Sequence, residues 1–234
     1  MQLRARREED KNARRRAILD AALAVWSVSS YADFTMSAVA GRAGVAKGTL
    51  YLYFATKEEL LLELLEELLG GWIDDLDRRL LERRGPWSPE EAARAMGRSL
   101  EGREPLVRLL TTSGGILEHN IGDARARRFK EMIRSRALRT GGLLAERLPI
   151  APESAMRLPF QAYALLTGFG EMAYPAPVVR RLLQEPGFEM FRIDAAGETE
   201  RAILALLRGL VAARPAGAPP GGRARGRGSR RTPR

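Results

Sequence analysis

The chain has 234 residues, a formal net charge of +10, a single histidine and no cysteine. This length suits one large domain or two small ones and is sufficient for a real hydrophobic core. The absence of cysteine excludes a disulfide scaffold, a thiolate nucleophile and any cysteine-ligated zinc or iron–sulfur site, and a lone histidine excludes multi-histidine metal sites. We therefore expect no metal site.

The hydropathy pattern argues against a membrane protein. No stretch approaches the roughly 18 uninterrupted apolar residues that a membrane-spanning helix requires. The basic N-terminal segment is not followed by an apolar run of the signal-peptide kind. We expect a soluble, cytoplasmic protein that has no membrane partner.

The positive charge is concentrated at the two ends of the chain. Residues 1–16 carry seven basic side chains against three acidic ones, and residues 214–234 carry seven arginines and no acidic residue. The body between them is close to neutral. Basic ends attract polyanions through counterion release, although an Arg/Gly/Pro-rich composition alone specifies no partner. We interpret residues 1–10 as a basic arm and residues 214–234 as a disordered tail.

The body is expected to be helical almost throughout. Ala, Leu, Arg and Glu dominate, and no sustained period-2 alternation indicates strands. Thr56 with Glu59, and Ser88 with Glu91, match the capping-box spacing at two helix starts. Within the fourth segment, Gly70-Gly71 predicts either a bend or a break. The expected helices are 11–28, 36–43, 46–53, 57–83, 89–101, 104–118, 123–147, 153–173 and 198–213, with a short helix at 177–185 as an option.

Residues 35–54 match the requirements of a helix-turn-helix. Ala40 supplies the small side chain at the helix crossing, and Gly44 supplies the left-handed turn without a steric penalty. Leu50 can anchor the second helix inward, and Thr35 can cap the first. The alternative is a plain helical corner in a bundle, with the nearby tyrosines in the core.

In the helix-turn-helix interpretation, the second short helix enters the major groove of DNA. Its outward face would carry Lys47, Gly48, Thr49, Tyr51 and Tyr53. A lysine can contact a guanine edge or a phosphate, and a threonine can contact a thymine methyl group or a phosphate. The order Ala46-Lys47-Gly48 does not match a phosphate-binding P-loop.

At this level the chain resembles the TetR/AcrR family of bacterial transcriptional repressors. The resemblance runs from about residue 12 to residue 65. It implies an all-α protein in which a three-helix DNA-binding domain, residues 11–57 with the helix-turn-helix at about 35–54, precedes a helical effector-binding and dimerisation domain, residues 58–213. The residues that carry it are 16–22, 34–35, 39–45, 47–51, 53–54 and 56–60.

The resemblance also implies roles for single residues in a double-stranded DNA operator complex. Phosphate contacts would come from the start of the second helix, base contacts from the start of the third, and backbone contacts from the residues that follow. The phosphate contacts are assigned to Thr35 and Ser37, and the base contacts to Lys47, Gly48 and Thr49. The contacts to the DNA backbone are assigned to Tyr51, Tyr53 and Lys57. Two residues depart from the family pattern: Ser30 replaces a usual glycine, which predicts a strained turn, and Ala46 replaces a common serine, which removes a helix cap.

The C-terminal body contains the candidates for an effector pocket and a dimer interface. The pocket candidates are the larger side chains and the one histidine. Taken singly, each large side chain is better explained by an ordinary bundle core, and the histidine by a helix end. The interface candidates form 3–4 spaced apolar or small positions on the last two long helices. The pocket candidates are Trp72, Met96, His119, Phe129, Met132, Phe160 and Tyr163. The interface candidates are Leu165, Gly168, Phe169, Ile203, Leu206, Leu207 and Leu210.

The resulting hypothesis is a homodimeric repressor that a small apolar or amphipathic effector releases from a palindromic operator. No nucleophile–base pair, metal cluster or dinucleotide fingerprint supports an enzyme or a cofactor. Within the family, an activator or a regulator without an effector remains an alternative. Outside it, the alternative is a non-specific nucleic-acid binder driven by the basic ends.

Overall fold

The computed structural model describes residues 2–82 and 85–213, and every described regular element is a helix. The elements follow the chain in the order expected from the sequence. They are α1 (Gln2–Trp26), α2 (Met36–Ala43), α3 (Lys47–Tyr51), α4 (Lys57–Glu82), α5 (Pro89–Leu100), α6 (Glu104–Thr112), η1 (Ser113–Leu117), η2 (Glu118–Asn120), α7 (Asp123–Arg147), α8 (Pro152–Ala173), α9 (Pro177–Leu182), η3 (Glu189–Phe191) and α10 (Ala195–Ala212).

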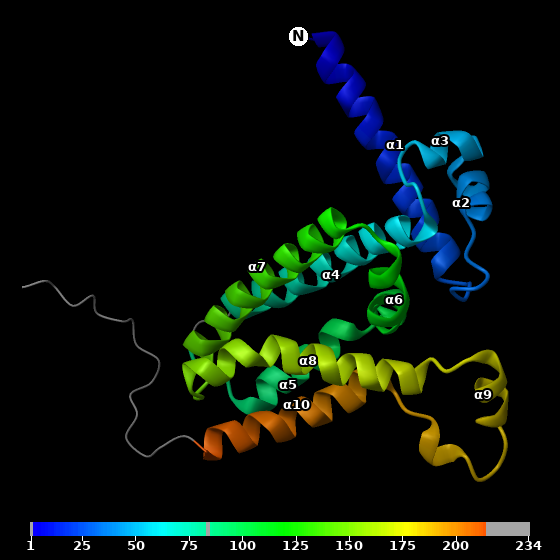
Figure 1. Ribbon diagram of the computed structural model, residues 1–234. Coiled ribbons are helices and arrows are strands. Elements are labelled where there is room, and N and C mark those ends of the chain that lie inside the picture. Colours follow the sequence, from blue (N-terminus) through cyan, green and yellow to red (C-terminus); the bar gives the residue numbers. More distant parts are fainter. Residues whose placement is uncertain (1, 83–84, 214–234) are drawn as a thin grey trace, which may run out of the picture.

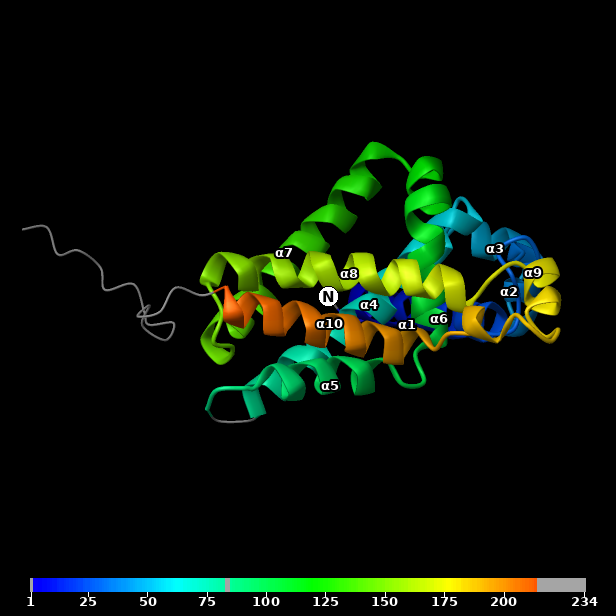
Figure 2. The same cartoon turned by 90° about the horizontal axis from the view of Figure 1, so that it is seen from below.

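Helix α4 joins the N-terminal helices to the rest of the molecule. Figure 1 shows α1, α2 and α3 grouped at one end, with α4 running from this group alongside α7. Helices α8, α10 and α5 form the layer on the other side of the body, as the view in Figure 2 confirms. Helices α1, α2 and α3 therefore lie at one end of a helical body.

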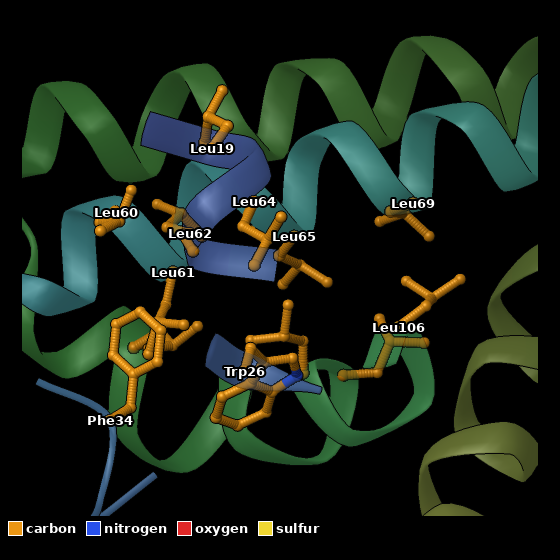
Figure 3. Close-up of a cluster of buried hydrophobic side chains, with 14 of the residues drawn as sticks. Leu19, Trp26, Phe34, Leu60, Leu61, Leu62, Leu64, Leu65, Leu69 and Leu106 are labelled. Atoms are coloured by element: carbon orange, nitrogen blue, oxygen red, sulfur yellow. The ribbon is translucent and has the colours of Figure 1, made fainter. Parts of the chain in front are cut away.

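The N-terminal helices share their hydrophobic core with the C-terminal body. Trp26 of α1 and Phe34 pack in a T-shaped arrangement, with ring centroids 6.2 Å apart. Leu61 and Leu65 of α4 and Leu106 of α6 belong to the same buried cluster (Figure 3). The expected boundary after residue 57 therefore does not separate two independent cores.

Helix α1 begins at Gln2 and not at residue 11, so the predicted basic arm is helical over residues 2–10. The physical reason is local: Arg, Ala, Glu and Lys are strong helix formers, and a helix already anchored by its buried second half propagates with one hydrogen bond per added residue. The buried half includes Ile18, Ala22 and Trp26.

Helix α4 is continuous through Gly70-Gly71, so of the two alternatives, a bend or a break, the break is excluded. The packing of α7 explains one of the two glycines. Arg136 donates a hydrogen bond to the carbonyl oxygen of Gly70 at 3.1 Å, and a Cβ atom at position 70 would lie only 2.9 Å from its guanidinium. No neighbour lies within 4 Å of a Cβ atom built at Gly71.

The segment after α6 also differs from the prediction of one helix over 104–118. The α-helix ends at Thr112 and continues as a wider π turn, η1, and then as the tight turn η2. Gly114-Gly115 lies inside η1, where the low helix propensity of glycine favours such a change in winding. The optional helix at 177–185 is present as the shorter α9, and the turn η3 was not predicted.

Some expectations concern residues outside the described part of the chain. The tail at 214–234 is among them, so its predicted disorder stays a prediction. Among the described residues, no helix is long and apolar enough to cross a membrane. No group of three or more potential metal ligands occurs in the same part of the chain.

Candidate nucleic-acid interface and effector cavity

The helix-turn-helix is built as its sequence predicts. Thr35 caps α2, because its Oγ1 accepts a hydrogen bond from the Ala38 N–H at 3.2 Å. Gly44 ends α2 in the left-handed conformation, with φ of 67°. Ala40 is buried at the crossing, and Leu50 anchors α3 in the core. These contacts fix the angle between the two short helices.

Replacing Gly44 with alanine should destabilise the protein by about 1–2 kcal/mol, because a Cβ atom is strained at positive φ. No atom lies within 4 Å of the added Cβ, so the cost arises in the backbone alone. The matched control is Gly71→Ala, which is equally unobstructed but lies inside a helix, where alanine is favoured by about 1 kcal/mol. Urea unfolding measures both changes. A Gly44→Ala protein as stable as the parent would show that this turn tolerates ordinary residues.

The outward surface of α3 carries the predicted base-reading residues. Lys47, Gly48 and Tyr51 are exposed, whereas Thr49 is half-buried. Ala46 precedes α3 without a side-chain cap, as expected from the sequence. Leu52 follows the helix and is 85% exposed. Lys47, Gly48 and Tyr51 are thus available to a groove of DNA without any movement of the core.

The predicted phosphate-contacting positions surround this helix. Thr35 and Ser37 are exposed at the start of α2, and Tyr53 is half-buried just after α3. The Thr35 hydroxyl accepts the capping bond from Ala38 and keeps its own proton free for a phosphate oxygen.

The capping box predicted for Thr56 and Glu59 at the start of α4 is half formed. The Glu59 N–H donates to the Thr56 hydroxyl at 3.1 Å, but the Glu59 carboxylate accepts from the Ala55 N–H and not from the Thr56 N–H.

Lys57 has a structural partner that sequence reasoning missed. Its Nζ donates to the carbonyl oxygen of Tyr31 at 3.1 Å and lies 3.9 Å from the centre of the Tyr31 ring. Tyr31 in turn donates its hydroxyl to Glu58 at 2.5 Å. Burial and then the Glu58 carboxylate raise the pKa of Tyr31 to about 12, so the phenol keeps its proton. Lys57 therefore fixes the loop before α2, whether or not it also meets DNA.

The predicted strain at Ser30 is absent. Among the described residues, only glycines have positive φ, so Ser30 has an ordinary backbone conformation. Its hydroxyl donates to the Asp33 carboxylate at 2.6 Å and accepts from the Asp33 N–H at 3.3 Å. This serine closes the turn with side-chain hydrogen bonds, where a glycine would have relied on backbone freedom.

The C-terminal body encloses a cavity of about 300 Å³ between α4, α5, α6, α7, α8 and α10. This lies at the lower end of the range for ligand pockets. Five of the predicted pocket residues line it: Trp72, Met96, Phe129, Phe160 and Tyr163. His119 and Met132 do not, so their assignment to the pocket is corrected. His119 is exposed on η2, and Met132 packs against the core cluster instead.

Three polar side chains in the cavity wall have hydrogen-bond partners within the protein. The indole N–H of Trp72 donates to Ser99 at 2.9 Å. Thr140 donates its hydroxyl to Asp77 at 2.7 Å, and Ser113 donates to the Leu110 carbonyl oxygen at 2.8 Å. With these donors satisfied, the interior offers a ligand chiefly apolar contact.

Charged side chains lie at the edge of the cavity. Lys130 pairs with Glu118 at 2.7 Å, and the lysine side chain is 60% exposed. Arg134 also lines the cavity, is exposed, and forms no hydrogen bond or ion pair with another described residue. The cavity therefore combines an apolar interior with cationic groups at its edge.

The structure divides the predicted dimer interface into two sets. Ile203 and Leu207 are buried within the protomer and line the cavity, so their assignment to the interface is wrong. Their spacing correctly marked a buried face, but the partner of that face is the protomer's own core. Gly168 is exposed, while the remaining four candidates are half-buried: Leu165, Phe169, Leu206 and Leu210.

Small residues occupy four of the exposed positions of α8 and α10. Ala164 and Gly168 are exposed on α8, and Ala205 and Gly209 are exposed on α10. A Cβ atom added at either glycine would meet no atom within 4 Å. The two helices pack side by side (Figure 2).

Comparisons with known proteins place both halves of the chain in one family. The family model described as bacterial regulatory proteins, tetR family, matches residues 18–64. The model described as tetracyclin repressor-like, C-terminal domain, matches residues 66–214. These matches, together with the helix-turn-helix and the all-helical body, define a DNA-binding transcriptional regulator and not an enzyme. The chain belongs to the TetR family.

Curated relatives match this chain over about a quarter of its length. The fatty acid metabolism regulator protein of Bacillus subtilis is 39% identical over 66 residues, which are 28% of this chain and 34% of the relative. The transcriptional repressor KstR of Mycolicibacterium smegmatis is 51% identical over 57 residues, or 24% of this chain and 28% of the relative. The chain thus matches about a third or less of the length of these proteins.

Solved structures extend the likeness to most of the fold. FadR from Bacillus subtilis, in complex with stearoyl-CoA, aligns with a TM-score of 0.51 at 20% identity, covering 82% of this chain and 96% of FadR. A putative TetR-family regulator from Syntrophomonas wolfei aligns with a TM-score of 0.56 at 16% identity, covering 89% of this chain and all of the other. At these identities the likeness concerns the fold.

Proposed function

We propose that the protein is a dimeric repressor that binds a palindromic operator and is released by an amphipathic effector with an anionic head group. The observation that carries this proposal is that one continuous fold combines an exposed helix surface with a separate internal cavity. One is the exposed surface of α3, with Lys47, Gly48 and Tyr51. The other is the cavity, which shares Leu69 and Trp72 of α4 with the core beneath the DNA-binding helices.

The class of effector follows from the chemistry of the cavity. The mostly apolar lining of the cavity favours a hydrocarbon chain, because a polar group placed there would lose its hydrogen bonds to water. The unpaired guanidinium of Arg134 favours an anionic head group at the edge. FadR of Bacillus subtilis, which shares the fold, was solved with stearoyl-CoA, a ligand of this class. The cavity volume of about 300 Å³ suits a medium-length acyl chain.

Release from DNA would follow from linkage between the two sites. A dimer reads successive major grooves only when its two recognition helices are about 34–36 Å apart. An effector that binds preferentially to another arrangement of the subunits lowers operator affinity by its differential affinity for the two arrangements. The shared core of α1, α4 and α6 provides the physical connection.

The experiment begins by selecting an operator from random double-stranded DNA with the purified protein. Fluorescence anisotropy then measures binding at near-physiological salt with excess competitor DNA. Dodecanoyl-CoA and dodecanoate should release the protein, whereas coenzyme A alone and dodecanol should not. Failure to enrich any palindromic sequence would contradict the repressor, and release by dodecanol as readily as by dodecanoate would contradict the anionic head group.

Gly168→Gln and Gly209→Gln should each raise the dissociation constant of the dimer at least about tenfold, which corresponds to about 1.4 kcal/mol. Both glycines are unobstructed within the protomer, so the larger side chain leaves the monomer intact but prevents close helix approach. Analytical ultracentrifugation over a concentration series measures the change. Gly71→Gln, equally exposed but on α4, is the control. Unaltered dimers in both variants would place the interface elsewhere.

A further inference from the structure

A single arginine of the C-terminal body holds the end of the first helix of the DNA-binding domain. Arg108, on α6, donates from Nη1 to the carbonyl oxygen of Trp26 at 3.1 Å and to that of Ser27 at 3.3 Å. Its Nη2 donates to the carbonyl oxygen of Ser29. The carbonyl groups at a helix end lack intrahelical partners, so a guanidinium fork there satisfies several of them at once.

The same contact is reinforced by the ring of Trp26. The Cζ atom of Arg108 lies 4.8 Å from the centre of the indole, a cation–π distance. The indole N–H donates to the carbonyl oxygen of Pro105 at 2.9 Å, so α6 holds this residue at two points. Burial lowers the pKa of Arg108 from its very high ordinary value, and the group nevertheless remains charged.

The Arg108 contact attaches the DNA-binding end to the body at a second place. Helix α4 is covalently continuous from the DNA-binding end into the body. A connection through this helix alone would leave the helix-turn-helix free to rotate about it. The end of α1 is a second attachment point, and it is made by a different helix. Two attachment points on different helices fix an orientation that one leaves free.

Helix α6 also contacts the other functional parts of the body. Leu110 and Ser113 line the cavity, within five residues of Arg108. Val107 and Thr111 pack so closely on α8 that a Cβ atom at Gly170 would lie 2.8 Å and 2.9 Å from their methyl groups. Arg108 therefore extends from a helix that is itself wedged between the cavity and α8.

We infer that Arg108 is a positioning residue that sets the orientation of the helix-turn-helix relative to the body, and thereby the half-site spacing that the dimer reads. It touches no DNA in this role and acts through the end of α1. Without the Arg108 contact, the binding-competent orientation becomes one of several. If the population of that orientation falls to about a tenth, operator affinity falls about tenfold. The penalty for altered spacing shrinks at the same time, because other orientations fit other spacings.

The test compares Arg108→Gln with the parent on three DNA duplexes: the selected operator, and versions with its half-sites one base pair closer or farther apart. This inference rests on the proposed operator binding, so the parent is measured first. Arg108→Gln should bind the selected operator about tenfold more weakly, while its preference for that spacing over the other two falls severalfold. Arg108→Lys keeps the charge but loses the two-pronged donor geometry of the guanidinium. Its operator affinity and spacing preference should lie between those of the parent and Arg108→Gln.

The control is Arg103→Gln, at the start of the same helix. Arg103 donates to the Ser99 carbonyl oxygen at 2.8 Å and pairs with Asp75 at 3.5 Å, both within the C-terminal body. It should keep the parental spacing preference even if its melting temperature falls. An Arg108→Gln protein with parental spacing preference, or one that loses affinity equally on all three duplexes, overturns the inference. A parent without operator preference contradicts the proposed function instead. If Arg108→Gln does not fold, Arg108→Lys decides the question.

Discussion

Truncating Tyr51 to alanine should lower operator affinity by roughly thirty- to a hundredfold without unfolding the protein. Tyr51 is 45% exposed on α3, whereas its neighbour Leu50 is fully buried and carries the packing. A single direct DNA contact at the low end of the usual range contributes about 1–1.4 kcal/mol, and the proposed two-fold symmetry removes two copies at once. Fluorescence anisotropy with the selected operator and excess competitor DNA measures the loss.

Three further variants separate the kinds of contact that α3 is expected to make with DNA. Tyr51→Phe keeps the ring and separates stacking against DNA from hydrogen bonding to phosphate. Lys47→Ala should reduce the slope of log affinity against log salt by about one for each lysine removed from a phosphate. Arg128→Ala removes an exposed charge from α7 and should change neither quantity. Parental affinity in the Tyr51→Ala and Lys47→Ala proteins would remove α3 from the DNA interface.

Filling the cavity should abolish effector binding and leave operator binding intact. Ala137 of α7 and Ala162 of α8 are buried and line the cavity from different helices. Ala137→Phe and Ala162→Phe each place a ring in the space that the ligand chain would occupy. The fluorescent anion 1-anilinonaphthalene-8-sulfonate serves as the probe, because it combines an apolar body with a negative head group. Fluorescence titration should show saturable binding to the parent and none to either variant.

Charge reversal at the cavity edge tests the head group separately. Arg134→Glu should weaken binding of the sulfonate probe about tenfold, since a charge-assisted contact becomes a repulsive one. Arg128→Glu, on the same helix but outside the cavity lining, is the matched control. Equal affinity in these two proteins would show that Arg134 does not select an anion. Binding that survives both phenylalanine variants would place the probe on another surface.

The helix-turn-helix was predictable because its determinants are local. Capping by Thr35, a left-handed turn at Gly44 and a small residue at position 40 each depend on neighbours within a few residues. The same holds for the capping box of Ser88 and Glu91, which the structure reproduces in full. Where local preference was underestimated, as at the start of α1, the error was one of length and not of type.

The cavity and the interface were only partly predictable because apolar spacing identifies a buried face without naming its partner. Ile203 and Leu207 satisfied the pattern of an interface stripe, yet they face the cavity of their own protomer. His119 was attractive as the only histidine, but its place on the turn η2 leaves it exposed. Both outcomes depend on how helices distant in sequence are arranged.

The sequence by itself determined the helical class, the helix-turn-helix and the chemistry of its reading surface, because helix propensity, caps and turns act over a few residues. Only the tertiary structure decided which apolar residues enclose a cavity, that Lys57 holds Tyr31, and that Arg108 binds the end of α1 across about eighty positions of sequence. Such contacts form when the shared core brings distant helices together. Burial then gives their hydrogen bonds and charges a strength that no local pattern encodes.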